Sequence, residues 1–181
     1  MTPAEFTILS LIVEKPSHGW EIEQIIEKRG MREWTALGFS SIYYLLQKLE
    51  KKNLIMSHTE SKPGRGPARK IYRSTAAGRE ACREQTLAAL QTPHRPQAPI
   101  LMGLANLPHV SLPEVLTGLK QYRQDLAERL MNIKSLRRAQ RPIPFHVEAL
   151  FDYSLTIIAA EKKWISKMIK QLEDKNGEDR F

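Results

Sequence analysis

The sequence predicts a mainly α-helical protein with one small β-hairpin, divided into two domains. Apolar residues recur at the spacing of amphipathic helices along most of the 181 residues. Two short segments rich in strand-forming residues flank a turn of prolines and glycines at 63–67. A proline-rich stretch at 93–99 separates a region of short helices from a region of long ones.

The first helix is predicted at the start of the chain. Thr2 and Glu5 have the spacing of a capping box, and Pro3 suits the first helical position. Apolar residues dominate positions 6 to 13, which predicts a buried helix. We expect it to end at Lys15, because the residue before a proline is pushed out of the α region.

A second helix is predicted from Ser17, which suits an N-cap, to Gly30, which suits the position after a helix end. It carries four apolar residues: Trp20, Ile22, Ile25 and Ile26. His18, beside the predicted cap, is interpreted as a structural or backbone-contacting residue and not as a ligand.

The third helix, from about Ser40 to Lys52, has two chemically different sides. An apolar stripe at i, i+3, i+4 and i+7 predicts the buried side: Ile42, Leu45, Leu46 and Leu49. The opposite side is polar and basic and includes aromatic hydroxyls: Ser40, Ser41, Tyr43, Tyr44, Gln47, Lys48 and Lys51. Asn53 follows, and asparagine tolerates the left-handed conformation that closes a helix.

A β-hairpin with a basic turn follows the third helix. Extended segments are predicted at 54–62 and 70–75, on either side of the turn at 63–67. Residues 48–73 hold eight lysines and arginines against two glutamates, so +6 of the chain's net charge of +8 lies in this window. Such a cluster favours a polyanionic partner.

The order helix, helix, helix, strand, strand predicts a winged helix-turn-helix, in which the third helix enters the major groove of DNA and the hairpin contacts the backbone. Donors and acceptors on Ser40, Tyr44 and Gln47 suit base edges. Five cations suit phosphates: Lys51, Lys52, Arg65, Arg69 and Lys70. Three neighbours complete the predicted DNA-binding set: Ser41, Tyr43 and Lys48. The alternative is a small α+β domain with a solvated basic loop.

Two long helices are predicted beyond the proline-rich stretch. Ser111 and Glu114 form a second capping box, and apolar residues then alternate at three- and four-residue spacing. The same apolar spacing resumes after Pro142 and Pro144. Two long helices with a short connection between them are predicted to form an antiparallel, coiled-coil-like pair. One such pair cannot cover all its apolar surface, so we expect a homodimer. The predicted dimerisation residues are Leu119, Tyr122, Leu126, Phe151, Ile158, Trp164, Ile165, Met168 and Leu172.

The domain organisation follows from these elements. A fourth helix, from 76 to about 91, has Thr75 as its predicted cap. We expect four parts: a winged helix-turn-helix DNA-binding domain at 1–92, a proline-rich linker at 93–99, a helical dimerisation domain at 100–175 and a disordered tail at 176–181. The start of the chain lacks the features of a secretory signal and no segment has the length of a membrane span, so a cytoplasmic location is expected.

Three separated segments also carry a family resemblance: His18-Gly19-Trp20-Glu21-Ile22, residues 41–50 with Asn53-Leu54-Ile55, and residues 70–80. In this order they resemble the PadR family of bacterial and archaeal transcriptional regulators, over residues 1 to about 90. The remaining half is similar in pattern to the longer members, which have a virulence-activator-type helical C-terminal domain. Trp20 and Asn53 stand where the family usually has tyrosine and glycine.

The resemblance implies a homodimer that binds a palindromic operator on double-stranded DNA, usually as a repressor. In some members a small aromatic or hydrophobic effector releases the operator. Trp164, Phe151 and Met168 could line such an effector pocket, although aromatic and aliphatic residues at helical spacing are more typical of a core or a dimer seam.

An enzyme and a protein-interaction module are the alternative classes. The five histidines are scattered, no cysteine or histidine pair has metal-ligand spacing, and no glycine-rich loop has the phosphate-binding form. We therefore expect no catalytic residue, metal site or cofactor. An interaction module would use the long amphipathic helices but would leave the basic turn without a role. Cys82, the single cysteine, is interpreted as structural and not as an oxidant sensor.

Overall fold

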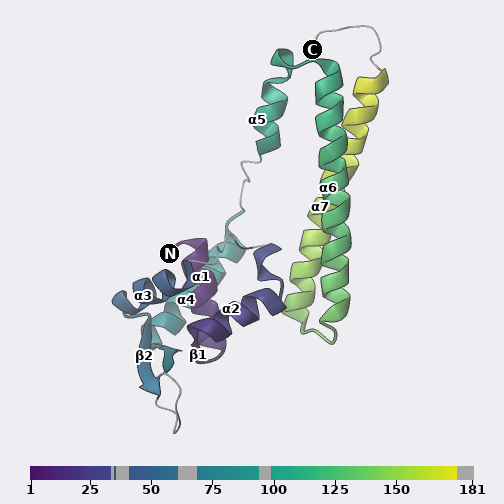
Figure 1. Cartoon of the computed structure of the whole chain (residues 1–181). Helices are drawn as coiled ribbons and strands as arrows, with labels where there is room; N and C mark the ends of the chain where they lie inside the picture. The colour runs from purple at the N-terminus through teal and green to yellow at the C-terminus, as the bar shows by residue number, and fades with distance from the viewer. Residues whose placement is uncertain (34, 36–40, 61–68, 94–98, 175–181) are drawn as a thin grey trace. The chain divides into compact units, whose positions relative to one another are not determined.

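The computed structural model of the protein describes residues 1–33, 35, 41–60, 69–93 and 99–174 (Figure 1). The chain forms two compact units, Met1–His94 and Arg95–Phe181. Most of the predicted linker at 93–99 and the whole predicted tail at 176–181 lie outside the described residues, so both stay predictions.

The first unit combines short helices with a small sheet. Its described elements are α1 (Pro3–Glu14), β1 (Ser17–His18), α2 (Gly19–Lys28), the 3-10 turn η1 (Met31–Glu33), α3 (Ser41–Lys51), β2 (Ile55–Glu60), β3 (Arg69–Ser74) and α4 (Ala76–Gln91).

Local signals start and end most of these helices where the sequence predicts. The amide of Glu5 donates to Oγ1 of Thr2 at 3.2 Å, and the amide of Thr2 donates to Oε2 of Glu5 at 2.8 Å, which completes the predicted capping box of α1. Thr75 caps α4. Gly30 and Asn53 follow α2 and α3 with φ angles of 61° and 56°, so both adopt the predicted left-handed conformation.

The start of α2 differs from the prediction. Ser17 does not cap this helix, because Ser17 and His18 form the short strand β1. The cap is His18, whose Nδ1 accepts from the amide of Glu21 at 3.3 Å. Ser17 lies opposite Tyr72 of β3, so the predicted two-stranded hairpin is part of a three-stranded antiparallel sheet in the order β1-β3-β2.

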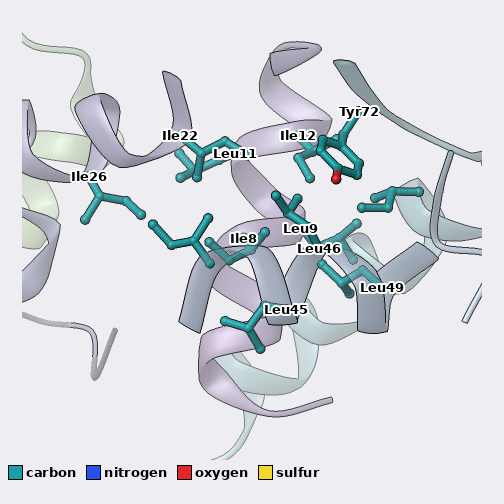
Figure 2. Packing of buried hydrophobic residues seen from close by; sticks show 12 residues of the cluster. Ile8, Leu9, Leu11, Ile12, Ile22, Ile26, Leu45, Leu46, Leu49 and Tyr72 are labelled. Carbon is teal, nitrogen blue, oxygen red and sulfur yellow. The ribbon is translucent and has the colours of Figure 1, made fainter. Parts of the chain in front are cut away.

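A closed hydrophobic core fills the first unit. The central helix α1 contacts α3, α4 and β3. Twelve buried residues from α1, α2, α3, β2 and β3 form the cluster in Figure 2: Ile8, Leu9, Leu11, Ile12, Ile22, Ile26, Ile42, Leu45, Leu46, Leu49, Ile55 and Tyr72. The predicted apolar stripe of α3 is therefore the buried one, and the opposite side of α3 faces solvent.

The second unit is built from helices alone in its described part. Its elements are α5 (Pro99–Ala105), the 3-10 turn η2 (Leu107–His109), α6 (Leu112–Ala139) and α7 (Phe145–Asp174). The long helices α6 and α7 lie side by side (Figure 1). They are antiparallel, because Lys120 near the start of α6 pairs with Glu173 near the end of α7, whereas Arg137 pairs with Glu148. The mainly helical class with a small antiparallel sheet is confirmed.

Nine buried side chains form the seam between α6 and α7, and many are seven residues apart: Val115, Leu119, Leu126, Ile133, Phe151, Ile158, Ile165, Ile169 and Leu172. At the start of α6, the carboxylate of Glu114 accepts from the amide of Ser111 at 3.1 Å. Within the described ranges, no helix combines the length and the apolar character needed to cross a membrane.

Candidate nucleic-acid interface

The exposed side of α3 is the centre of the candidate interface. Tyr43 and Tyr44 are 56% and 62% exposed, and Gln47 and Lys51 are exposed as well. Ser41, the first residue of the helix, is half-buried. Phenol, carboxamide and ammonium groups therefore face solvent on one rigid helix, as base-edge and phosphate contacts require.

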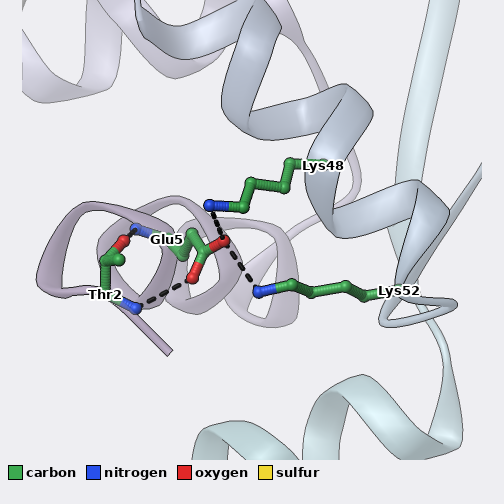
Figure 3. A network of polar contacts seen from close by, with 4 residues as sticks. All are labelled: Thr2, Glu5, Lys48 and Lys52. Carbon is green, nitrogen blue, oxygen red and sulfur yellow. Dashed lines mark hydrogen bonds and ion pairs between the residues drawn. The ribbon is translucent and has the colours of Figure 1, made fainter.

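Lys48 has a different position from the other predicted contact residues on α3. Its ammonium lies 3.0 Å from Oε1 of Glu5, and the ammonium of Lys52 donates to the same oxygen at 2.8 Å (Figure 3). The other oxygen of Glu5 accepts from the Thr2 amide in the capping box. Glu5 is only 1% exposed, so α1 holds the basic side of α3 through a buried carboxylate.

The charge of Glu5 is stabilised by these neighbours. Its pKa is lowered from 4.5 to about 2, mainly because the Lys52 ammonium donates to the carboxylate. Burial opposes this effect, and the Thr2 amide and the Lys48 ammonium lower the pKa further. The hydrogen bond between the Lys48 ammonium and Glu5 raises the pKa of Lys48. Glu5 therefore stays ionised at neutral pH and orients α3 against α1.

A second carboxylate joins α3 to the sheet. Glu50 accepts from the hydroxyl of Ser57 on β2 and from the ammonium of Lys70 on β3, the latter at 2.9 Å. These two donors, in that order of effect, lower the pKa of Glu50. The Lys70 ammonium also lies 5.3 Å from the ring centroid of Tyr72. Lys70 is exposed, so its positive charge lies on the surface beside α3.

The remaining predicted contact residues cannot be placed. Ser40 and Arg65 lie outside the described residues. Arg69 begins β3 opposite Glu60, but the structure describes only its backbone. The contribution of these three side chains to the interface stays a prediction.

A cleft next to α3 is lined in part by residues absent from the predicted DNA-binding set, among them Trp20. It encloses about 260 Å³ and is lined by His18, Gly19, Trp20, Tyr43, Lys70 and Tyr72. The indole of Trp20 is 61% exposed, although its sequence pattern groups it with Ile22 and Ile26. The helical period carried the correct signal, because positions 20 and 22 differ by about 200° around a helix.

The predicted dimerisation residues occupy two environments in the second unit. Six of them are already buried between α6 and α7 of a single chain: Leu119, Leu126, Phe151, Ile158, Ile165 and Leu172. Tyr122 and Met168 are half-buried, and Trp164 is 45% exposed. Burial and the hydroxyl's hydrogen bond to Glu161 at 2.7 Å raise the pKa of Tyr122 to about 12.

An exposed apolar stripe runs along α7. Leu150, Tyr153, Ile157 and Trp164 are all exposed, and their spacing of three, four and seven residues places them on one side of the helix. This spacing is that of a coiled-coil seam, although the seam to α6 lies elsewhere on the helix. The seven-residue spacing of Leu150, Ile157 and Trp164 is the sequence signal by which this second surface could be found.

An apolar groove in the second unit could hold a small molecule. It encloses about 390 Å³ between α5, η2 and α6, within the usual range of ligand pockets. Its lining residues are Ile100, Gly103, Leu104, Leu107, Val110, Val115, Gly118, Leu119 and Tyr122. Trp164, Phe151 and Met168, considered above as pocket residues, do not line it.

The Cys82 thiol lies outside the surfaces described above. Cys82 is half-buried against the core of the first unit, and burial raises the pKa of its thiol. A raised pKa disfavours the thiolate that oxidant sensing requires. Among the described residues, no group of three His, Cys, Asp or Glu side chains is arranged to hold a metal ion.

Comparison with known proteins places the fold. Residues 8–84 match the family described as "Transcriptional regulator PadR-like family". No curated protein sequence matches the chain.

Solved structures resemble the chain over nearly its whole length. PadR from Bacillus subtilis in complex with p-coumaric acid has a TM-score of 0.78 and 15% identity, with 95% of this chain and 99% of that chain covered. The same protein in complex with operator DNA has a TM-score of 0.77 and 15% identity, with 93% and 98% covered. A PadR-like transcriptional regulator from Bacillus cereus has a TM-score of 0.70 and 19% identity, with 95% and 97% covered. At these identities the likeness establishes the fold.

Proposed function

Because the chain belongs to the PadR-like family of transcriptional regulators, we propose that it is a sequence-specific repressor that binds a palindromic operator as a homodimer. The observation that carries the proposal is the side of α3 that bears Tyr43, Tyr44, Gln47 and Lys51, exposed beside the cationic strand β3. In a winged helix-turn-helix this side enters the major groove. The complex of Bacillus subtilis PadR with operator DNA supports an operator as the partner.

The primary test is selection of bound fragments from genomic DNA with the purified full-length protein. We expect a two-fold symmetric site whose halves are centred about one helical turn, roughly 34 Å, apart. Failure to bind any duplex at low salt would overturn the proposal, because the electrostatic contribution to DNA binding is largest there. That result would favour the protein-interaction module.

Two variants on α3 separate sequence reading from charge. Gln47→Ala should change which operator bases are preferred, since a carboxamide reads base edges. Lys51→Ala should weaken operator and random duplex alike and reduce the slope of log affinity against log salt by about one unit. Gel-shift titrations at several salt concentrations distinguish the two. A changed base preference in Lys51→Ala with an unaltered slope would contradict the assignment.

The homodimer is proposed to form through the exposed stripe of α7. The seam between α6 and α7 is already occupied within one chain, whereas Leu150, Tyr153, Ile157 and Trp164 remain uncovered. A second copy could bury this stripe as a coiled-coil contact. Sedimentation at micromolar concentration should give a dimer, and a monomer there would contradict this architecture.

We also infer that a small hydrophobic or aromatic effector binds in the groove between α5, η2 and α6. The p-coumaric acid complex of Bacillus subtilis PadR supports an effector of this class. Gly118 offers a direct test, because a Cβ added there meets no atom within 4 Å. Gly118→Leu should fill the groove and abolish calorimetric binding of aromatic acids, whereas the exposed neighbour Thr117→Leu should not. If both variants bind an acid as the original chain does, the groove is not the effector site.

The effector should act by changing operator affinity. A coupling of about 1 to 3 kcal/mol would change operator affinity some 5- to 150-fold. Operator titrations with and without each acid that binds measure this coupling. A compound that binds but leaves operator affinity unaltered is not an effector.

A further inference from the structure

The cleft beside α3 has two kinds of surface, one aromatic and one charged. Its apolar walls are the aromatic rings of Trp20, Tyr43 and Tyr72, and its charged end is the ammonium of Lys70. These residues come from α2, α3, and β3, so the cleft lies where the helix-turn-helix meets the sheet.

Tyr43 is positioned by the absence of a side chain at Gly19. A Cβ at Gly19 would lie 2.6 Å from Cε1 of Tyr43, a separation that real Cβ atoms do not show. The tyrosine ring therefore lies directly against the first residue of α2. Glycine is needed here for close approach of the ring and not for an unusual backbone angle.

Lys70 is positioned by its own contacts. Its ammonium donates to Glu50 at 2.9 Å and lies 5.3 Å from the centroid of the Tyr72 ring. A lysine held at both sides loses less side-chain entropy when it meets an anion. The cleft thus presents a cation next to two exposed aromatic faces, those of Trp20 and Tyr43.

From this geometry we propose that the cleft binds one sugar–phosphate unit of the DNA backbone, with the deoxyribose against the indole of Trp20 and the phosphate at Tyr43 and Lys70. Deoxyribose has an apolar face, and phosphate oxygens accept from tyrosine and lysine side chains. Trp20 is then a DNA contact from α2, additional to those of α3 and the strands. The proposal rests on the proposed DNA binding and names a further contact within it.

The size and place of the cleft favour DNA over a small molecule. Its volume of about 260 Å³ is small, whereas ligand pockets usually exceed about 300 Å³. It also shares Tyr43 with the exposed side of α3, so a duplex bound to that helix would pass over it. Lysines along α3 and β3 complement a polyanion at this place.

Fluorescence of Trp20 in the full-length protein tests the contact. Subtracting the fluorescence of the Trp20→Phe variant from that of the original chain isolates the indole of Trp20 among the three tryptophans. We expect saturating random-sequence duplex at low salt to reduce acrylamide quenching of Trp20 at least about twofold, since a deoxyribose packed against the indole excludes solvent. Quenching of Trp20 by aromatic acids without any effect of duplex would overturn the assignment to DNA.

Substitution of Trp20 tests its contribution to affinity. Trp20→Ala should weaken binding of random duplex about tenfold with an unaltered salt slope, whereas Trp20→Phe should retain most of the affinity. Both variants should melt at the temperature of the original chain, because the indole is largely exposed. If the original chain does not bind duplex, the proposed function fails. If it binds, and Trp20→Ala binds as tightly with Trp20 still open to acrylamide, only this inference fails.

Discussion

The two units of the chain bury apolar surface in different ways. The first closes a core from five elements, with twelve buried residues around α1. The second has one seam between α6 and α7, and four exposed apolar side chains share another side of α7: Leu150, Tyr153, Ile157 and Trp164. The first unit therefore has the packing of a complete domain, whereas the second has the packing of one part of a larger helical assembly.

The charged contacts differ in the same way. Glu5 in the first unit is 1% exposed and meets two lysines, whereas the pair of Lys120 and Glu173 in the second unit is about half exposed on both sides. Buried charge pairs are sensitive to loss of one partner, and exposed pairs contribute little. The Glu5 carboxylate therefore helps to position α3 in the first unit, whereas the pair of Lys120 and Glu173 contributes little beside the apolar seam of the second.

The largest expected effect is on the closed core. Leu46→Ala removes a fully buried side chain of α3 and should lower the free energy of unfolding by about 2 to 5 kcal/mol. Leu150→Ala, the same change on the exposed stripe, should leave unfolding of the first unit unaltered. Urea denaturation followed by circular dichroism measures both. An equal loss in the free energy of unfolding in both variants would contradict the difference in packing between the core of the first unit and the exposed stripe of α7.

The buried carboxylate of Glu5 should make the stability of the first unit depend on pH. Glu5 has a folded pKa of about 2, below its ordinary 4.5, so its contribution is fully present above pH 4.5 and is lost as pH falls toward 2. The shift corresponds to roughly 3 kcal/mol. Glu5→Gln should therefore be less stable than the original chain at pH 6, with the difference shrinking below pH 4.5.

Glu173→Gln is the matched control for the pH experiment, because its lysine partner lies on an exposed surface. We expect unfolding curves of this variant to coincide with those of the original chain at each pH. A constant difference between Glu5→Gln and the original chain from pH 6 to pH 2 would show that the Glu5 charge is not what stabilises α3.

The exposed stripe of α7 should control self-association of the chain. Ile157→Asp places a charge in the proposed dimer seam and should weaken self-association about 100-fold or more. Ala159→Asp adds the same charge to an exposed position of α7 outside the stripe and should leave association unaltered. Sedimentation velocity over a concentration series compares the two. Equal dissociation constants would place the dimer contact elsewhere.

A pair of glycines gives the smallest expected effect. Gly19→Ala must displace the Tyr43 ring, so we expect about threefold weaker duplex binding with little change in melting temperature. Gly118→Ala in α6 meets open space and should stabilise the helix by about 0.5 to 1 kcal/mol without any effect on DNA. Binding by Gly19→Ala equal to that of the original chain would show that Tyr43 can move without loss.

The sequence by itself determined the features that depend on neighbours in the chain. The capping box of Thr2 and Glu5, the cap at Thr75 and the left-handed residues after α2 and α3 all satisfy backbone groups locally. The buried stripe of α3 and the alternating rhythm of α6 and α7 follow from the helical period, which one sequence displays fully. These features sufficed for the fold class and for the exposed side of the reading helix.

Only the tertiary structure decided the features that join distant parts of the chain. Strand β1 consists of two residues without a pattern of their own, and it exists because β3 offers free backbone partners. The burial of Glu5 and its contacts with Lys48 and Lys52 arise when α1 packs against α3. The predicted DNA contact of Lys48 stays a prediction. Likewise, Gly19 and Tyr43 meet only after α2 and α3 have folded together, and this meeting creates the cleft beside Trp20. Spacing along a helix reports which residues share a side, but contact between sides depends on packing in three dimensions.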